Sequence, residues 1–399
     1  MNKQLKKVIE YANKHSEYYQ TLFLNNQIDC NNISELTFNK IPIMTKLDYK
    51  LNVKKIIVDE YQYNHINFLN KITTSGSSGI PLTIYFEPRE YTISNLILWR
   101  LRKKWYGVNP YDKMCAFTSD LAINGIVMDA QDVYIRGNKM FFSKIKISRE
   151  SISSYFQHIQ KFSPKWLYIQ PSVMMNLYSY MCEENLKLPD SLTYIELFGE
   201  NVSYHFLKKL KQYYRNIDIA VMYGAKEFNA IALMCPCGKM HILDNNVFIE
   251  TNDNNEIIVT GLVNTKVPII RYNLQDRITL KENFLCKCGI QGSIIEEIIG
   301  RSCNIEYIDD NITSDLLKWI IEKVNYLYSE CIYEYRLCSV KENKIVVGIY
   351  LNNSYLSWKK IISEEIKKYF RSFLSTSKAV EIVILNNCDV SLQSGKFKY

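Results

Sequence analysis

The chain has 399 residues, of which 47% are hydrophobic and 23% are charged, and its formal net charge is +8. This composition is typical of a globular protein and excludes a disordered one, and the length predicts a large domain and a smaller one. No apolar run reaches the roughly 20 residues that a membrane helix needs, and the basic first residues lack the apolar stretch of a signal peptide. We therefore expect a cytoplasmic protein without a membrane partner.

The positive charge is dispersed along the sequence. Its lysines form no block, and no nucleic-acid-binding module is recognisable. A basic surface would attract nucleotide phosphates or coenzyme A as readily as RNA. We expect no nucleic-acid partner, although a zinc-containing nucleic-acid binder stays open as a third class of function, which steep salt dependence of binding would reveal.

The first 106 residues are predicted to form helices, a glycine loop and one strand. The first 15 residues favour an amphipathic helix, because Leu5, Val8, Ile9 and Ala12 recur on one face. Further helices and loops follow. The next predicted elements are a polar glycine loop, a strand of alternating pattern and a long helix, at 72–82, 83–86 and 90–106.

Short apolar runs alternate with helices in the middle of the chain. Strands are predicted at 166–169, 194–198 and 217–222, and Pro171 suits the first turn of the intervening helix. Strand–helix–strand order at this spacing predicts an α/β fold with parallel strands. The second of these strands ends at Gly199-Glu200, and ligands bind at the carboxyl ends of such strands.

The character of the sequence changes after Gly300. The segment that follows is predicted to form a compact α+β unit, with helices at 315–328 and 358–373 and strands at 332–338, 344–351 and 379–385. We place a domain boundary at Gly300, which divides the chain into a large multi-layer domain of residues 1–300 and a small domain of residues 301–399.

Five short motifs carry residues suited to nucleotide chemistry, and the first is the glycine loop. Its N–H and O–H donors are of the kind that wrap phosphate oxygens, and they come from Thr74, Ser75, Gly76, Ser77, Ser78 and Gly79. The loop is not a Walker loop, because no Gly-Lys-Ser/Thr sequence follows. Taken alone, it equally describes a polar surface turn.

Two further motifs follow strand-like runs. In the segment 223–227, Gly224 permits a sharp strand exit, Tyr223 could stack on a purine, and Glu227 could bind Mg²⁺. In the segment 268–276, Asp276 could accept hydrogen bonds from both hydroxyls of a ribose. In isolation each has a simpler explanation, an ordinary strand-end turn or a surface Arg–Asp pair.

The last two motifs are Gly300-Arg301 and, near the C-terminus, Ser394-Gly395-Lys396. A lysine on a glycine-flanked tail can swing into a site and bring a point charge to a developing anion. A solvated terminal lysine is the simpler alternative.

The order of these motifs is more informative than any one of them. Together they resemble the adenylate-forming superfamily, above all its phenylacetate-CoA ligase branch with related capsule-biosynthesis proteins. The segment 41–46, Ile-Pro-Ile-Met-Thr-Lys, is similar to that branch's Ile-Pro-x-x-Thr-Lys element, and 268–276 is similar to its Pro-Leu-Ile-Arg-Tyr-x-x-x-Asp motif. Nearly the whole chain is covered.

The resemblance implies ATP as cofactor and a mobile C-terminal lid domain. It also implies roles for single residues. Ser75 to Gly79 would hold the β- and γ-phosphates, and the adenine would be framed by Gly199, Glu200 and Tyr223. Asp276 would bind the ribose, Glu227 would bind the Mg²⁺ ion, and Arg271 would line the nucleotide site. Arg301 would lie at the hinge, and Lys396 would neutralise the carboxylate and the α-phosphate.

Three positions depart from the pattern of that branch. Lys226 stands where threonine or serine is usual, Gln275 where glycine is usual, and the segment 302–304 where an acidic pair is usual. The first replaces a hydroxyl near the phosphates by a charge, and the last bears on rotation of the C-terminal domain.

Four of the eleven cysteines form two matched Cys-x-Cys-Gly units, Cys235 with Cys237 and Cys286 with Cys288. Four thiolates from two tight turns suit a tetrahedral Zn²⁺ ion, and a closed site of this kind would be structural. His241 could replace one thiolate or reach toward the substrate pocket. Unpaired buried cysteines are the alternative.

We predict ATP-dependent activation of a small carboxylic acid, an aryl acid among the options, as its acyl-AMP with release of pyrophosphate. Transfer to coenzyme A as a thioester would follow. Transfer to an amine or to a carrier thiol is the alternative second step, since a fold does not determine the acceptor, and a non-catalytic relative that binds nucleotide or an acyl ligand is the alternative function. The sequence does not determine the oligomeric state, and a homodimer is one alternative.

Overall fold

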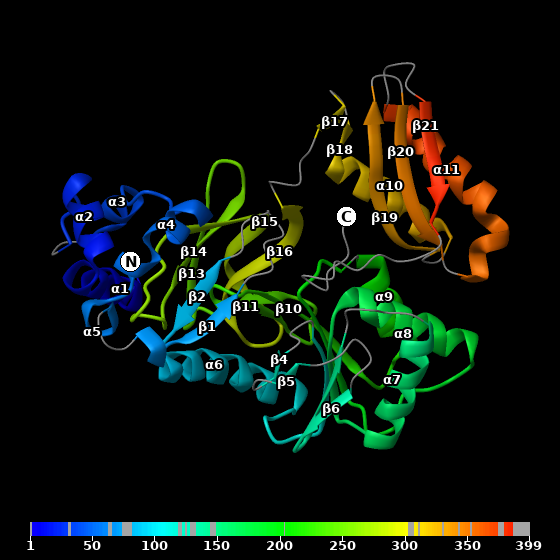
Figure 1. Cartoon of the computed structure of the whole chain (residues 1–399), viewed down its shortest axis with the longest axis horizontal. Coiled ribbons are helices and arrows are strands. Elements are labelled where there is room, and N and C mark those ends of the chain that lie inside the picture. The colour runs from blue at the N-terminus through cyan, green and yellow to red at the C-terminus, as the bar shows by residue number, and fades with distance from the viewer. Residues whose placement is uncertain are drawn as a thin grey trace. The chain divides into compact units, whose positions relative to one another are not determined.

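The computed structural model describes residues 2–30, 33–62, 66–73, 82–118, 122–123, 126–127, 133–143, 149–202, 204–301, 307–309, 312–328, 331–341, 344–351, 353–373 and 379–385. The chain divides into two compact units, one of residues 1–109 and 220–302 and the other of residues 110–219 and 303–399, and each is taken by itself (Figure 1). Among the described helices, none has the length and apolar character that crossing a bilayer requires.

The first unit opens with a group of helices. The predicted apolar face of α1 (Lys3–His15) is confirmed, since Leu5, Val8, Ile9 and Ala12 are all buried. Thr45 and Asp48 form a reciprocal cap at the start of the fourth helix, which pairs donors that a helix otherwise leaves open. The other helices here are α2 (Glu17–Asn25), α3 (Glu35–Asn39), α4 (Lys46–Ile56), α5 (Asp59–Gln62) and η1 (Ile66–Phe68).

The two strands that flank the glycine loop in the sequence pair with each other. Strands β1 (Asn70–Thr73) and β2 (Thr83–Phe86) are antiparallel, with Thr73 opposite Thr83. Helix α6 (Pro88–Tyr106) follows with proline in its first turn and ends at Gly107, whose φ of +64° suits a residue without a side chain. The strand and the long helix predicted here are therefore confirmed.

Seven antiparallel strands of the first unit lie side by side. Strand β10 pairs with β11 in this way because a turn of three residues, 226–228, cannot supply the crossover that a parallel pair needs. The spatial order is β10 (Asp218–Ala225), β11 (Asn229–Met234), β12 (Met240–Ile242), β16 (Gln291–Arg301), β15 (Tyr272–Leu285), β14 (Glu256–Gly261) and β13 (Val247–Thr251).

The two motif segments at 41–46 and 268–276 meet in this unit, more than 200 residues apart in the sequence. The backbone N–H of Met44 donates to the carbonyl of Arg271 at 2.8 Å, and the N–H of Asn273 donates to the carbonyl of Met44 at 3.0 Å. Met44 thereby forms a parallel bridge with Tyr272. The N-terminal helices are thus attached directly to the start of β15.

The second unit contains two of the three predicted strands, at 166–169 and 194–198, and they run parallel, whereas the third is β10 of the first unit. Four of its strands run parallel, and β6 adds an antiparallel edge, in the spatial order β9 (Tyr194–Phe198), β8 (Trp166–Ile169), β3 (Met114–Thr118), β7 (Lys139–Ser143) and β6 (Val133–Arg136). A short pair, β4 (Ala122–Ile123) with β5 (Ile126–Val127), is separate. The helices, drawn in green in Figure 1, are α7 (Arg149–Phe162), α8 (Pro171–Glu183) and α9 (Tyr204–Tyr213).

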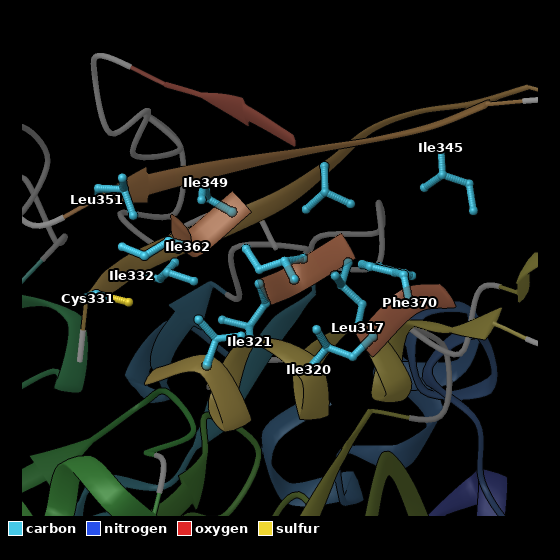
Figure 2. Close-up of a cluster of buried hydrophobic side chains, with 13 residues drawn as sticks. Leu317, Ile320, Ile321, Cys331, Ile332, Ile345, Ile349, Leu351, Ile362 and Phe370 are labelled. Carbon is cyan, nitrogen blue, oxygen red and sulfur yellow. The ribbon is translucent and has the colours of Figure 1, made fainter. Parts of the chain in front are cut away.

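The C-terminal segment forms the predicted α+β arrangement. Strand β20 pairs with β19 in antiparallel fashion and with β21 in parallel. Side chains of both long helices point toward these strands and form one buried apolar cluster that includes Ile320, Ile349 and Phe370 (Figure 2). The elements are β17 (Tyr307–Asp309), β18 (Ile312–Thr313), α10 (Ser314–Leu327), β19 (Ile332–Lys341), β20 (Lys344–Leu351), η3 (Asn353–Trp358), α11 (Lys359–Phe373) and β21 (Ala379–Ile384).

The chain passes from the first unit into the second after residue 302. The predicted boundary at Gly300 lies two residues earlier. Because residues 110–219 are grouped with the C-terminal segment rather than with residues 1–109, the division into 1–300 and 301–399 stays a prediction.

Candidate active site

The residues predicted to meet the adenine and the ribose are in direct contact. The Tyr223 hydroxyl on β10 donates a hydrogen bond of 2.7 Å to Oδ2 of Asp276 on β15. The two residues are 53 positions apart, and both side chains are half-buried. The structure therefore brings a carboxylate and an aromatic ring together from two strands that are not neighbours in the sheet.

Gly224 is required by a close approach of two backbone segments. A Cβ atom at this position would lie 2.3 Å from the carbonyl oxygen of Asn229, well inside van der Waals contact. The register of β10 and β11 shifts between Tyr223 and Gly224, so the chain bends here and then turns through Lys226 and Glu227. Only glycine permits this bend without displacing a neighbour.

Glu227 is held in that turn by a tyrosine of the ribose motif. The hydroxyl of Tyr272, at the start of β15, donates to Oε1 of Glu227 at 3.2 Å. Tyr272 itself is 2% exposed and packs edge-on against Tyr49 and Phe228. The carboxylate that is predicted to bind Mg²⁺ thus has a fixed position, and the motif residue that fixes it had no role assigned from the sequence.

The side chain of Arg271 is hydrogen-bonded to other residues of the protein. Its guanidinium makes four hydrogen bonds: Nε and Nη2 donate to Oε1 of Glu250 at 3.0 and 2.5 Å, and Nη1 donates to the carbonyls of Asn39 and Ile41 at 2.8 and 2.5 Å. The group also lies 5.3 Å from the centre of the Phe38 ring. Burial raises the pKa of Glu250, and the contact with Arg271 opposes that rise.

These contacts give Arg271 a structural explanation beside the predicted catalytic one. The guanidinium joins β13, which carries Glu250, to the N-terminal helical segment that ends in the 41–46 motif. No signal in the sequence identified Glu250 as its partner, because a glutamate at the end of an alternating strand is usually a surface residue.

Gln275 adopts a backbone conformation that favours glycine. Its φ is +62°, in the left-handed region that costs an ordinary residue about 1–2 kcal/mol. The side chain of Asn273 compensates in part, since its Oδ1 accepts the N–H of Gln275 at 2.6 Å. The structure thus explains why glycine is usual here in the branch that the motifs resemble.

Gly199 and Glu200 belong to the second unit, at the exit of β9. Gly199 has a φ of +77°, and Oε2 of Glu200 accepts the N–H of Ser172 at 3.0 Å in the first turn of α8. A carboxylate at this position satisfies an open donor and stabilises the helix dipole. This hydrogen bond orients the Glu200 side chain, independently of any ligand.

Several predicted residues lie outside the described residues or are described in part. Lys396 and the whole run of Thr74, Ser75, Gly76, Ser77, Ser78 and Gly79 belong to the first group. Arg301 is described by its backbone, which pairs with Asp276 across β15 and β16. The predicted hinge residue is therefore the cross-strand neighbour of the predicted ribose ligand.

The two cysteine units meet at the ends of neighbouring hairpins. Ligand atoms of Cys235, His241, Cys286 and Cys288 lie within 4.8 Å of one another, whereas Cys237 is exposed and is not in this group. Burial and Lys104 lower the pKa of His241, and burial raises the pKa of Cys288 to about 11. The structure therefore brings three of the four predicted thiols together with His241, the alternative ligand that the sequence offered.

Comparisons with known proteins agree on the fold. The 2-hydroxyisobutyryl-CoA ligase in its postadenylation state is 16% identical, with a TM-score of 0.74 over 97% of this chain and 86% of that chain. The anthranilate CoA ligase AuaEII in complex with anthranoyl-AMP is 12% identical, with a TM-score of 0.55 over 82% of this chain and 65% of that chain. The chain therefore has the α/β fold of adenylate-forming CoA ligases, as the motifs predicted.

A curated protein is also similar in sequence. Protein CapK of Staphylococcus aureus is 24% identical over 319 residues, which are 75% of this chain and 67% of that protein. No family model matches the sequence. The similarity agrees with the branch that the motifs resemble.

Proposed function

We propose that this protein activates a small carboxylic acid with ATP, forming an acyl-AMP and releasing pyrophosphate. The observation that carries the proposal is the hydrogen bond between Tyr223 and Asp276, on a fold shared with CoA ligases that were solved as acyl-AMP complexes. Two motifs far apart in the sequence meet where an adenosine would need an aromatic ring and a carboxylate.

The chemistry follows from the charges that must meet. A carboxylate oxygen of the acid attacks the α-phosphorus of ATP, the bond to the β-phosphate oxygen breaks, and pyrophosphate leaves, so no enzyme nucleophile is needed. Two anions approach each other in this step. Cations and donors that offset their repulsion supply most of the acceleration.

Residues of the first unit would hold the nucleotide. Asp276 would accept the ribose hydroxyls, and the Tyr223 ring would lie against the adenine. Glu227 would bind a Mg²⁺ ion on the phosphates, and residues 74–79 would wrap them. Lys396 would bring its charge to the carboxylate and the α-phosphate.

A structural Zn²⁺ ion and a second half-reaction complete the proposal. Coenzyme A is the proposed acceptor, because the thiol can attack the acyl carbon and displace AMP to give a thioester. A mobile C-terminal domain hinged at Gly300-Arg301 would exchange the adenylation and transfer arrangements. Transfer to an amine or a carrier thiol would use the same acyl-AMP.

Pyrophosphate release is the test. The protein is incubated with ATP and Mg²⁺ against a panel of aryl, hydroxy and short-chain acids, each alone, with coenzyme A and with amines. Acid-dependent release is expected, and the acceptor that adds turnover names the second step. No release with any acid, despite measurable ATP binding, would favour a non-catalytic nucleotide-binding protein.

Two variants make the test specific to the proposed nucleotide site. Asp276→Asn removes the charge from the ribose ligand and is expected to raise the KM for ATP by about tenfold or more, the cost of one hydrogen bond to a charged group. Asp253→Asn is the matched control, because Asp253 is exposed in the β13–β14 turn. Equal kinetics for the two variants would remove Asp276 from the site.

A further inference from the structure

The cysteine units occupy two turns with the same backbone hydrogen bonds. In the β11–β12 connection, the N–H of Cys235 donates to the carbonyl of Lys239 and the N–H of Gly238 to that of Cys235, both at 2.8 Å. In the β15–β16 connection, the N–H of Cys286 donates to the carbonyl of Ile290 and the N–H of Gly289 to that of Cys286, both at 3.0 Å.

The glycines explain why both turns can form. Gly238 and Gly289 have φ values of +78° and +83°, which a residue with a side chain rarely adopts. Strand β12 pairs with β16, with His241 opposite Ile294, and ligand atoms from both turns lie within 4.8 Å of one another. Each turn therefore presents its first cysteine to the other.

Two of the distances between the ligand atoms match a tetrahedral metal site. The sulfur atoms of Cys235 and Cys286 are 3.8 Å apart, and Nε2 of His241 is 3.4 Å from the sulfur of Cys288. With Zn–S of about 2.3 Å and Zn–N of about 2.0 Å, tetrahedral geometry places two sulfurs about 3.8 Å apart and a sulfur and a nitrogen about 3.5 Å apart. The spacing is too long for a disulfide, whose sulfurs are about 2 Å apart.

His241 is better placed than Cys237 to be the fourth ligand. The His241 side chain is 2% exposed, and its ring lies 5.6 Å from that of Trp105 on α6. Its Nδ1 is buried and has no hydrogen-bond partner among the residues that the structure describes, so packing orients that side of the ring and leaves Nε2 toward Cys288. Cys237, by contrast, is exposed.

We propose that Cys235, His241, Cys286 and Cys288 bind one Zn²⁺ ion, and that Cys237 is a free surface thiol. Three thiolates and an imidazole at tetrahedral spacing select Zn²⁺ over Mg²⁺ or Ca²⁺, which prefer oxygen ligands. All four positions of the ion are filled by protein, so the site is structural and activates no water.

The ion links β15, which carries Asp276, to a hairpin beside the strand that carries Tyr223. Cys235 follows β11, the neighbour of β10, and Cys286 follows β15. The metal therefore joins the β11–β12 and β15–β16 connections, and the Tyr223–Asp276 hydrogen bond joins β15 to β10. Loss of the ion is expected to lower the free energy of unfolding. The strands that carry the nucleotide residues would then be held less firmly.

Metal content of the purified full chain tests the ligand set. Elemental analysis is expected to find one zinc per chain in the wild type and in Cys237→Ser, and a loss of at least about tenfold in Cys286→Ser and His241→Ala. Cys237→Ser is the matched control, because it removes the same atom from the equivalent turn. Zinc lost from Cys237→Ser but kept by His241→Ala would overturn the assignment in favour of four thiolates.

Two measurements on the wild type keep the proposal testable if a variant does not fold. X-ray absorption at the zinc edge is expected to show three sulfur ligands and one nitrogen ligand. A thiol reagent applied to the native protein is expected to modify Cys237 before a strong chelator is added, and Cys235, Cys286 and Cys288 only afterwards. Folded wild-type protein without bound metal would overturn the site.

The outcome is independent of the proposed reaction. Metal content and thiol reactivity are measured without ATP or an acid, so a protein that holds zinc but releases no pyrophosphate would sink only the activation of carboxylic acids. A metal-free protein that releases pyrophosphate would sink only the zinc site.

Discussion

The contacts of Arg271 lead to a prediction that separates a structural role from a catalytic one. Arg271→Met keeps most of the aliphatic stem and removes the guanidinium with its four hydrogen bonds. The substitution leaves the Glu250 carboxylate, whose side chain is 20% exposed, without its counter-charge. It also leaves the carbonyls of Asn39 and Ile41 without this donor.

The expected loss of stability is large. Removing one partner of a buried ion pair costs about 3–5 kcal/mol, and the partial exposure of Glu250 places the estimate near the lower end, at about 3 kcal/mol. The double variant Arg271→Met, Glu250→Met removes the unpaired charge as well. It should therefore recover part of the loss, leaving a deficit of about 1–2 kcal/mol from the two carbonyls.

The assay is urea unfolding followed by intrinsic fluorescence, combined with calorimetric titration of ATP well below the unfolding transition. We expect Arg271→Met to lose about 3 kcal/mol while folded protein binds ATP with an affinity within about threefold of the wild type. An Arg271→Met protein of undiminished stability that no longer binds ATP would refute this reasoning and restore Arg271 to the nucleotide site.

Three further substitutions have expected outcomes. In urea unfolding, Gln275→Gly should leave the free energy of unfolding unchanged or raise it by up to about 1 kcal/mol, because glycine adopts the left-handed φ freely. Gln275→Val should lower the free energy of unfolding by about 2 kcal/mol. Equal stabilities of the two variants would contradict a strained backbone at this position. Gly224→Ala should lose about 1–3 kcal/mol in the same assay, because its Cβ would overlap the Asn229 carbonyl; Gly261→Ala, whose Cβ would only touch Phe228 at 3.5 Å, is the control. Lys396→Ala should slow acyl-AMP formation by about 100-fold or more with ATP binding retained, whereas the neighbouring Lys398→Ala should not; unchanged adenylation would remove Lys396 from the mechanism.

Elements with a strong period were predictable from the sequence. The apolar face of α1, the strand and helix after the glycine loop and the order of elements after Gly300 depend on local spacing of apolar residues, and the structure confirms them. The antiparallel sheet of the first unit was not predicted. Its pairing depends on short turns such as 226–228 and on contacts between distant strands, which no local pattern encodes.

The candidate site was predictable where a motif carries it. The motifs predict that Tyr223 and Asp276 bind opposite ends of one adenosine, and the two side chains form a hydrogen bond. The contacts that hold them were not predictable, because the partner of Arg271 is a glutamate on another strand and the partner of Glu227 is a tyrosine 45 residues away. At the cysteines, sequence spacing alone could not identify the fourth metal ligand, because Cys237 and His241 differ in burial and burial is not visible in the sequence.

The bridge between Met44 and Tyr272 has a consequence for how the protein is made. The N-terminal helices leave the ribosome first, yet the strand on which they dock is synthesised only after the whole segment 110–219 has been added. At about 5–20 residues per second, these helices wait on the order of ten seconds before their docking strand exists. The order of synthesis therefore leaves the nascent N-terminal segment without its docking strand for the whole of that interval.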